Sequence, residues 1–418
     1  MKVIIVGGGI GGLATALSLH AVGIASIVFE QRSQIRELGV GINTLPHAIK
    51  VLAGLGLLPA LDGAGVRTGE LIYMNRQGSR IWQEARGLAA GFEVPQFSIH
   101  RGKLQGVLRQ AVVERLGEAA IRTGHQLVDF EQNQLGVSAR FKTGADTGLA
   151  SVHGDVLLGC DGIHSRVRAA FYPDEGPPSW NGIMLWRGAT WWPPFLSGRS
   201  MIIAGGMGAK LVLYPILTDP ARPGEVLMNW AVTSRKGKPG PPPHREDWSR
   251  PGRLADLLPL VQDKFTLAEL DPVALIRATP EFYEYPMCDR EPLRRWSHGR
   301  VTLLGDAAHP MYPVGSNGAS QAILDAQCLA QALAAQPGDS VAALAAYETQ
   351  RLAPTTDIVL TNRVGGPERV IDLVEGRAPE GFTDINTVAS HDELTAIVRG
   401  YAQTAGFTAP GKLSGPGP

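Results

Sequence analysis

The chain has 418 residues, and its 39 Lys and Arg residues balance its 39 Asp and Glu residues, so the formal net charge is zero. This length suits one large two-lobed enzyme or a few domains, and the charge balance excludes the basic surface of a protein that binds nucleic acid or an anionic membrane. Three scattered cysteines without metal-ligand spacing indicate a reducing cytoplasm and no metal site.

The stretch from Val3 to Phe29 contains no Asp, Glu, Lys or Arg, a feature shared with signal peptides and membrane spans. Five of the six residues Gly7–Gly12 are glycine, which would weaken a spanning helix. We therefore expect a cytoplasmic protein without a membrane segment.

The first thirty residues predict the opening of a doubly wound sheet. Lys2–Val6 is a β-branched run typical of a buried parallel strand, Gly11–Val22 has apolar residues at helical spacing, and Ile27–Glu30 predicts a second strand. A strand, turn, helix and strand in this order form the βαβ unit that binds dinucleotides.

Gly7, Gly9 and Gly12 form a G-x-G-x-x-G pattern between the first strand and the helix. Gly7 permits the tight turn, Gly9 lets the backbone approach a pyrophosphate, and Gly12 allows close packing of helix on strand. Glu30 ends the second strand, where a carboxylate can bind a ribose hydroxyl. The sequence therefore predicts a dinucleotide site here.

The middle of the chain mixes helices with strands. We expect helices at Pro46–Leu58 and Arg101–Leu116, and strands at Leu71–Gln83, Phe92–Ile99 and Asp155–Leu158. Four further strand segments are unusually aromatic and predict a separate antiparallel sheet: Ile183–Trp192, Met201–Ala204, Lys210–Pro215 and Leu227–Val232.

The last part of the chain returns to the parallel-sheet pattern with a strand at Val301–Leu304. A helix follows at Gln321–Ala335, then a helix at Ala342–Leu360 that we expect Pro354 to interrupt. Residues Gly411–Pro418 predict a disordered tail.

Two further motifs follow buried strands. GCDGIHSRVR, Gly159–Arg168, places Asp161 and Ser165 where they can contact a nucleotide or simply cap the next helix. LLGDAAHPMYPVGSNGASQAILDA, Leu303–Ala326, joins a strand to a helix through a loop rich in proline and glycine. That loop is either a surface turn or a backbone that presents N–H groups to a ligand.

Together the three motifs resemble those of the class A FAD-dependent aromatic monooxygenases, the family of para-hydroxybenzoate hydroxylase. The resemblance covers Lys2 to Arg363. Within the family, MLWRGAT and YPMCDREPL most resemble members that act on a methylphenazine carboxylate.

The resemblance implies an α/β fold with a Rossmann-like FAD-binding domain and an interleaved antiparallel β-sheet substrate domain. We assign residues 1–70, 100–171 and 290–335 to the FAD-binding domain and 71–99 and 172–289 to the substrate domain. A C-terminal helical segment, 336–410, and a disordered tail, 411–418, complete the chain.

The resemblance also implies roles for individual residues. Asp306 contacts the FAD ribityl chain, Arg101 faces the pyrophosphate or ribityl region, Asp161 contacts FAD and NAD(P)H, and Arg32 lies near the adenosine. His309 we interpret as a hydrogen-bonded structural histidine. The loop that covers the isoalloxazine edge consists of Pro313, Val314, Gly315, Asn317 and Gly318. Its glycines let backbone N–H groups point at the flavin N1–C2=O region.

The chemistry implied is aromatic hydroxylation. Non-covalent FAD accepts hydride from NAD(P)H, reacts with O₂, and transfers one oxygen atom from a flavin C4a-hydroperoxide, without a protein nucleophile. The sequence has no second G-x-G-x-x-G unit, so the nicotinamide binds transiently, and no basic cluster marks a 2′-phosphate site, which favours NADH.

We expect the substrate, a flat polycyclic aromatic such as a phenazine or polyketide, either neutral or anionic, to lie between the aromatic sheet and the loop. The expected lining residues are Trp186, Arg187, Tyr214, Trp230 and Tyr285, although aromatic residues in strands usually belong to the core.

Two other functions stay open at this point. One is Baeyer–Villiger or epoxidation chemistry, and the other is a non-catalytic FAD- or ligand-binding protein. We expect a monomer or a homodimer with a small-molecule partner.

Overall fold

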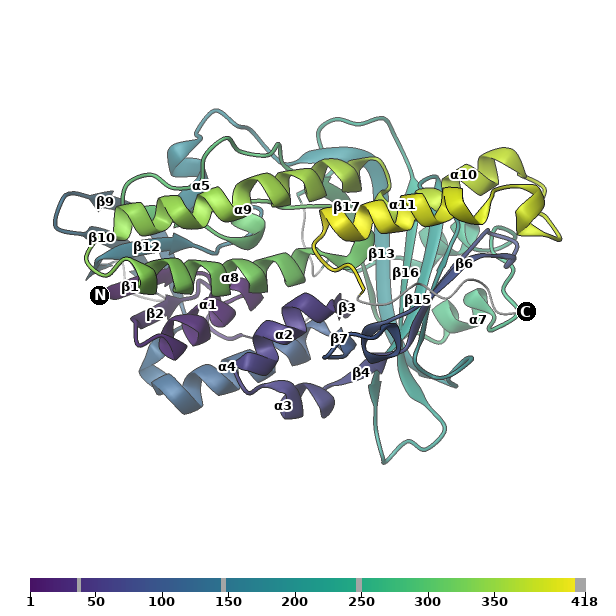
Figure 1. Ribbon diagram of the computed structural model, residues 1–418, viewed down its shortest axis with the longest axis horizontal. Helices are drawn as coiled ribbons and strands as arrows, with labels where there is room; N and C mark the ends of the chain where they lie inside the picture. The colour runs from purple at the N-terminus through teal and green to yellow at the C-terminus, as the bar shows by residue number, and fades with distance from the viewer. Residues whose placement is uncertain (36–38, 144–147, 246–249, 410–418) are drawn as a thin grey trace.

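The computed structural model describes residues 1–35, 39–143, 148–245 and 250–409, and the predicted disordered tail lies outside these ranges. Two large β-sheets lie side by side along the long axis of the molecule, with helices packed along both (Figure 1). The predicted α/β fold is confirmed.

The first sheet is parallel and has five strands. Their order is β18 (Val301–Leu303), β12 (Val156–Gly159), β1 (Lys2–Val6), β2 (Ala25–Phe29) and β8 (Ile121–Arg122). It shares one apolar core with helices α1 (Ile10–Ala21), α4 (Arg101–Leu116), α8 (Gly318–Ala335) and α9 (Ser340–Arg363). Because helices cover this sheet, its strands are apolar on both faces, as the sequence predicts.

The second sheet has seven strands, and its order departs from a simple antiparallel meander. The order is β17 (Phe282–Asp289), β13 (Ser179–Trp192), β16 (Val226–Arg235), β15 (Ala209–Thr218), β14 (Ser200–Ala204), β5 (Glu70–Met74) and β6 (Arg80–Ala85). The β14–β5 pair is parallel, and the other neighbouring strands are antiparallel.

Two apolar clusters cover opposite faces of this sheet. One includes α6 (Leu254–Leu257) and α7 (Pro272–Arg277), and the other includes α10 (Arg369–Arg377) and α11 (His391–Thr404). The two C-terminal helices lie alongside the sheet, coloured yellow in Figure 1. The C-terminal part of the chain thus returns to the strands near residues 70–85.

Two smaller sheets and a short helix complete the fold. A three-stranded sheet has the order β3 (Gly41–Thr44), β7 (Gln96–His100) and β4 (Gly65–Thr68). Another, which the sequence analysis missed, consists of β11 (Leu149–Gly154), β10 (Val137–Thr143) and β9 (His125–Gln132). Helix α5 spans Arg166–Phe171.

Three expected elements differ from the structure. The helix expected at Pro46–Leu58 is two helices, α2 (Pro46–Gly54) and α3 (Leu58–Asp62), and the long strand expected from Leu71 is a hairpin of β5 and β6. The prediction that Pro354 interrupts the helix was wrong, because α9 continues through Pro354. Buried residues on both sides, Tyr347 and Ile358, hold that helix against the core and outweigh the loss of one backbone hydrogen bond.

Among the helices of the described ranges, none combines the length and the apolar character that crossing a membrane requires.

Candidate active site

The glycine-rich turn after β1 has the geometry of a phosphate-binding turn. Gly7 has a φ of +111°, and a Cβ there would lie 2.3 Å from the Cys160 carbonyl oxygen. A Cβ on Gly12 would lie 2.0 Å from the Gly7 carbonyl oxygen, whereas one on Gly9 would meet nothing within 4 Å. The open space at Gly9, next to the start of α1, fits a bound pyrophosphate.

Glu30 is held in place at the end of β2. Its carboxylate accepts hydrogen bonds from the backbone N–H of Gly8 at 2.9 Å and of Arg32 at 2.8 Å. The Gln105 amide donates to the Gly8 carbonyl at 2.7 Å, which braces the same turn. Glu30 therefore lies beside the glycine turn, as a ribose-binding carboxylate must, while the Arg32 side chain is exposed.

Asp161 caps helix α5. It accepts hydrogen bonds from the Ser165 hydroxyl at 2.5 Å and from the Arg166 N–H at 2.7 Å, and the Ser165 hydroxyl accepts from the Arg168 N–H at 2.9 Å. Burial raises the pKa of Asp161, against the opposite effect of these hydrogen bonds. The capping interpretation describes both side chains, and the role of Asp161 toward a cofactor stays a prediction.

Asp306 and Arg101 come from distant segments and act on each other electrostatically. Asp306 follows β18 in a short 3₁₀ turn, and Arg101 begins α4. The Asp306 residue is exposed and lies in the wall of a cavity. Desolvation by the surrounding protein raises the pKa of its carboxyl group. Burial lowers the pKa of Arg101, and the Asp306 charge opposes that effect.

The loop after Asp306 has a fixed, unusual backbone. Gly315 and Ser316 have positive φ values of 64° and 58°. A Cβ on Gly315 would lie 2.1 Å from the Tyr401 hydroxyl oxygen, so only glycine fits there. The Asn317 amide donates to the Tyr401 hydroxyl at 2.8 Å and to the Gly315 carbonyl at 3.1 Å. Helix α8 begins directly afterwards, at Gly318.

His309 belongs to a buried network. Its Nε2 lies 2.6 Å from an Asp325 carboxylate oxygen, and Asp325 also accepts from Arg351 at 2.7 Å and from the Gly305 N–H at 3.1 Å. This network fixes the backbone where β18 enters the loop. The structural interpretation of His309 therefore agrees with its surroundings.

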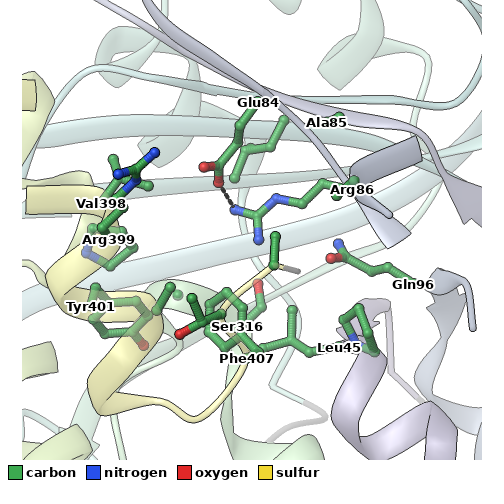
Figure 2. Close-up of a pocket in the computed structure, with 18 of the residues that line it drawn as sticks. Leu45, Glu84, Ala85, Arg86, Gln96, Ser316, Val398, Arg399, Tyr401 and Phe407 are labelled. Atoms are coloured by element: carbon green, nitrogen blue, oxygen red, sulfur yellow. Dashed lines mark ion pairs between the residues drawn. The ribbon is translucent and has the colours of Figure 1, made fainter. Parts of the chain in front are cut away.

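Two cavities border the loop. The smaller, of about 70 Å³, has Asp306, Pro310 and Pro313 in its wall, together with Arg187 and Tyr285. The larger, of about 400 Å³, has Gly315 and Ser316 in its wall together with residues of β5, β6, β14 and α11. Figure 2 shows this larger cavity. The loop thus borders a small cavity at its first residues and a larger cavity at its middle.

Known proteins match this chain along most of its length. Residues 1–178 and 277–361 match the family described as FAD binding domain. Phenazine 1,6-dicarboxylic acid hydroxylase PhzS of Lysobacter antibioticus is 46% identical over 364 residues, which cover 86% of this chain and 89% of that protein. The chain belongs to the FAD-dependent aromatic monooxygenases. A second relative, 3-hydroxybenzoate 6-hydroxylase 1 of Aquipseudomonas alcaligenes, is 32% identical to this monooxygenase over 91% of the chain and 95% of the relative.

Solved structures agree on the fold. The crystal structure of HpxO from Klebsiella pneumoniae, complexed with FAD and uric acid, superposes with a TM-score of 0.74 and covers 98% of this chain and 97% of its own, at 24% identity. The cofactor of this monooxygenase is FAD, with NAD(P)H and O₂ as co-substrates.

The structure separates the five residues expected to line the substrate pocket. Arg187 and Tyr285 line the smaller cavity, where an Arg187 N–H donates to the Tyr285 hydroxyl at 3.2 Å. The Tyr214 hydroxyl donates to the Gly41 carbonyl at 2.8 Å. Trp186 and Trp230 belong to the core on the α7 side, and neither is in the wall of the smaller or the larger cavity.

Most residues in the wall of the larger cavity were not predicted from the sequence. Its side chains come from strands and helices far apart in the chain and include Tyr73, Arg86, Gln96, Met201, Tyr401 and Phe407. No motif links these positions. Only the fold, which brings α11 back onto β5 and β14, assembles them.

Proposed function

We propose that this monooxygenase hydroxylates a planar polycyclic aromatic acid of the phenazine type, bound in the larger cavity. The observation that supports this most strongly is that cavity, because it reaches the loop residues Gly315 and Ser316. The 46% identity to a protein named phenazine 1,6-dicarboxylic acid hydroxylase supports the substrate class.

The size and lining of the cavity suit such a ligand. Its volume of about 400 Å³ lies within the range of roughly 300 to 1,000 Å³ found for small-molecule sites. Leu71, Met201 and Ile203 supply an apolar sheet wall, and Phe407 and Tyr401 supply aromatic rings. Flat apolar walls favour a fused aromatic ring over an aliphatic ligand of equal volume.

The cofactor site we propose runs from the glycine turn to the loop. Gly9 would border the pyrophosphate and Glu30 the adenosine ribose, while Asp306 and Arg101 would hold the ribityl region. When bound, FAD would accept hydride from NAD(P)H and activate O₂. The start of α8 and the backbone N–H groups from Val314 to Gly318 would stabilise negative charge on the bound flavin.

The protein's own side chains position the substrate and exclude water. Burial raises the pKa of Tyr73, a residue of the cavity wall, well above its ordinary value, so its phenol stays neutral and acts as a donor rather than a base. Burial likewise raises the pKa of Tyr401. We therefore assign no proton abstraction to these tyrosines.

We also propose a cytoplasmic location, NADH rather than NADPH as donor, and a monomer or homodimer. The balanced charge and the scattered cysteines support the first of these.

The test is NADH oxidation by the FAD-loaded protein with a panel of phenazine carboxylates, unsubstituted phenazine, hydroxybenzoates and polyketide ketones. We expect phenazine acids to accelerate oxidation and to give a product heavier by one oxygen atom. A ring-expanded lactone or an epoxide would support the alternative oxygenase chemistry instead. NADH consumption that no ligand accelerates would contradict the proposal.

A further inference from the structure

Three charged side chains line the larger cavity: Glu84, Arg86 and Arg399. Glu84 ends toward Arg86 and forms an ion pair with it, and Arg399 lies on the other side of the cavity (Figure 2). No ion pair is found for Arg399 among the described residues, and its side chain is exposed. The two arginines and one glutamate give the wall a formal charge of +1, which favours an anionic ligand.

Arg86 has an unused donor in a buried place. Its side chain is only 12% exposed, and Glu84, at 6%, occupies one end of the guanidinium. The Nε–H finds no acceptor in the part of the chain that the structure describes. A buried donor without a partner costs about 1 to 3 kcal/mol, so such groups normally meet a ligand, an ion or a water molecule.

Gln96 provides a second unused polar group on the same wall. The residue is 2% exposed, and its amide oxygen has no partner within the described residues. The amide can turn so that its NH₂ rather than its oxygen faces a ligand, because the two orientations look alike. Figure 2 shows Gln96 beside Arg86, both directed at the cavity.

We infer that Arg86 and Gln96 form the subsite that binds the carboxylate of the aromatic substrate, an assignment that rests on the proposed function. Glu84 binds Nη2 and keeps the guanidinium in one orientation, and the Nε–H remains without a partner among the described residues. The Phe407 ring lies 5.9 Å from the Arg86 guanidinium carbon and covers this end of the cavity. The substrate ring then extends along the apolar wall toward Gly315 and Ser316.

A cationic ligand or an unsubstituted ring would not use both groups. A cation would meet Arg86 directly, and an unsubstituted ring would leave the Nε–H and the Gln96 amide buried without partners. The subsite therefore selects acids, and it sets which end of the substrate faces away from the loop.

The experiment measures binding through the change in flavin fluorescence of the FAD-loaded protein. The two probes are phenazine-1-carboxylate and unsubstituted phenazine. In the wild type we expect the acid to bind more tightly. In Arg86→Gln, binding of the acid should weaken about tenfold to a hundredfold, the effect of losing a charge-assisted hydrogen bond, while phenazine binding stays the same. Arg86→Lys should fall between the two.

Glu84→Gln gives a test of opposite sign. It removes the negative charge next to the bound carboxylate, so it should tighten acid binding and leave phenazine unaffected. Should Arg86→Gln fold poorly because Glu84 loses its partner, the Glu84→Gln/Arg86→Gln double variant restores neutrality and should still lose the preference for the acid. Arg399→Gln removes an equal charge at an exposed position and should weaken acid binding by about fivefold at most.

Equal binding of acid and phenazine by the wild type, or equal losses for both probes in Arg86→Gln, would overturn the carboxylate subsite while product formation still supports the proposed function. Binding of neither probe by the wild type would overturn both.

Discussion

Gly9 and Gly12 have different roles in the glycine-rich turn after β1, and substituting each by alanine distinguishes these roles. A methyl group on Gly12 would collide with the Gly7 carbonyl, whereas one on Gly9 would project into open space. We predict that Gly12→Ala lowers the free energy of unfolding by about 1 to 3 kcal/mol. Gly9→Ala should leave the apoprotein stable but weaken FAD binding. Thermal unfolding without FAD and FAD titration measure the two effects, and an equal loss of stability in both variants would contradict the assignment.

The buried Asp325 predicts an acid-dependent part of the stability. Burial raises its pKa, but the charges of His309 and Arg351 outweigh that effect and lower it from 3.8 to about 2. A depressed pKa stabilises the fold above the unfolded value, and this contribution, about 2 kcal/mol, is lost as the pH falls from about 4 to about 2.

Asp325→Asn should therefore be less stable by about 3 to 5 kcal/mol at neutral pH, because it removes the buried carboxylate that pairs with Arg351 and lies 2.6 Å from His309. Its stability should also depend less on pH in the acid range. Asp62→Asn removes an exposed partner of Arg67 and should cost about 1 kcal/mol or less. Urea unfolding at several pH values measures both, and equal costs would speak against the buried network.

At the scale of elements, helix α11 fixes the loop of residues 313–318 through one tyrosine. The Tyr401 hydroxyl donates to Asn362 at 2.9 Å and accepts from Asn317, next to Gly315. We predict that Tyr401→Phe costs about 1 to 3 kcal/mol and raises the share of NADH oxidation that ends as hydrogen peroxide. Tyr347→Phe is the matched control. The Tyr347 hydroxyl donates to the Leu303 carbonyl at a distance of 3.1 Å, and this hydrogen bond does not involve residues 313–318. Unchanged coupling in Tyr401→Phe would show that α11 does not set the loop.

Elements with a local pattern could be predicted, and those defined by distant contacts could not. The bounds of Arg101–Leu116 agree with the structure because the apolar periodicity lies within the helix itself. Strand alternation places Trp186 and Arg187 on opposite faces of β13 but cannot say which face meets the loop. Trp186 lies in the core, and Arg187 lines the smaller cavity. The larger cavity stayed hidden because its walls meet only after α11 packs on β5.

At the scale of the whole molecule, one junction ties the seven-stranded sheet to strand β3. Gly41 at the start of β3 donates to the Asn229 side chain at 2.8 Å, and its carbonyl accepts from Tyr214 and Arg187. A Cβ on Gly41 would lie 2.6 to 2.8 Å from Ile216, Tyr214 and Asn229. The three strands that bear Arg187, Tyr214 and Asn229 thus converge on one peptide.

Gly41→Ala should weaken that junction. We predict a loss of about 1 to 3 kcal/mol and separate unfolding midpoints for tryptophan and flavin fluorescence, which should coincide in the wild type. Gly54→Ala in α2 is the control, since a Cβ there meets nothing within 4 Å. Coincident midpoints in both variants would argue against a junction between the lobes.

The most direct test of the account is the source of the oxygen atom in the product. FAD-loaded protein would be supplied with NADH and phenazine-1-carboxylate under isotopically heavy dioxygen, and the product weighed by mass spectrometry. The account predicts one heavy oxygen atom per product molecule and one NADH consumed for each. A product that carries oxygen from water, or NADH oxidation that yields only hydrogen peroxide with every aromatic acid, would contradict it.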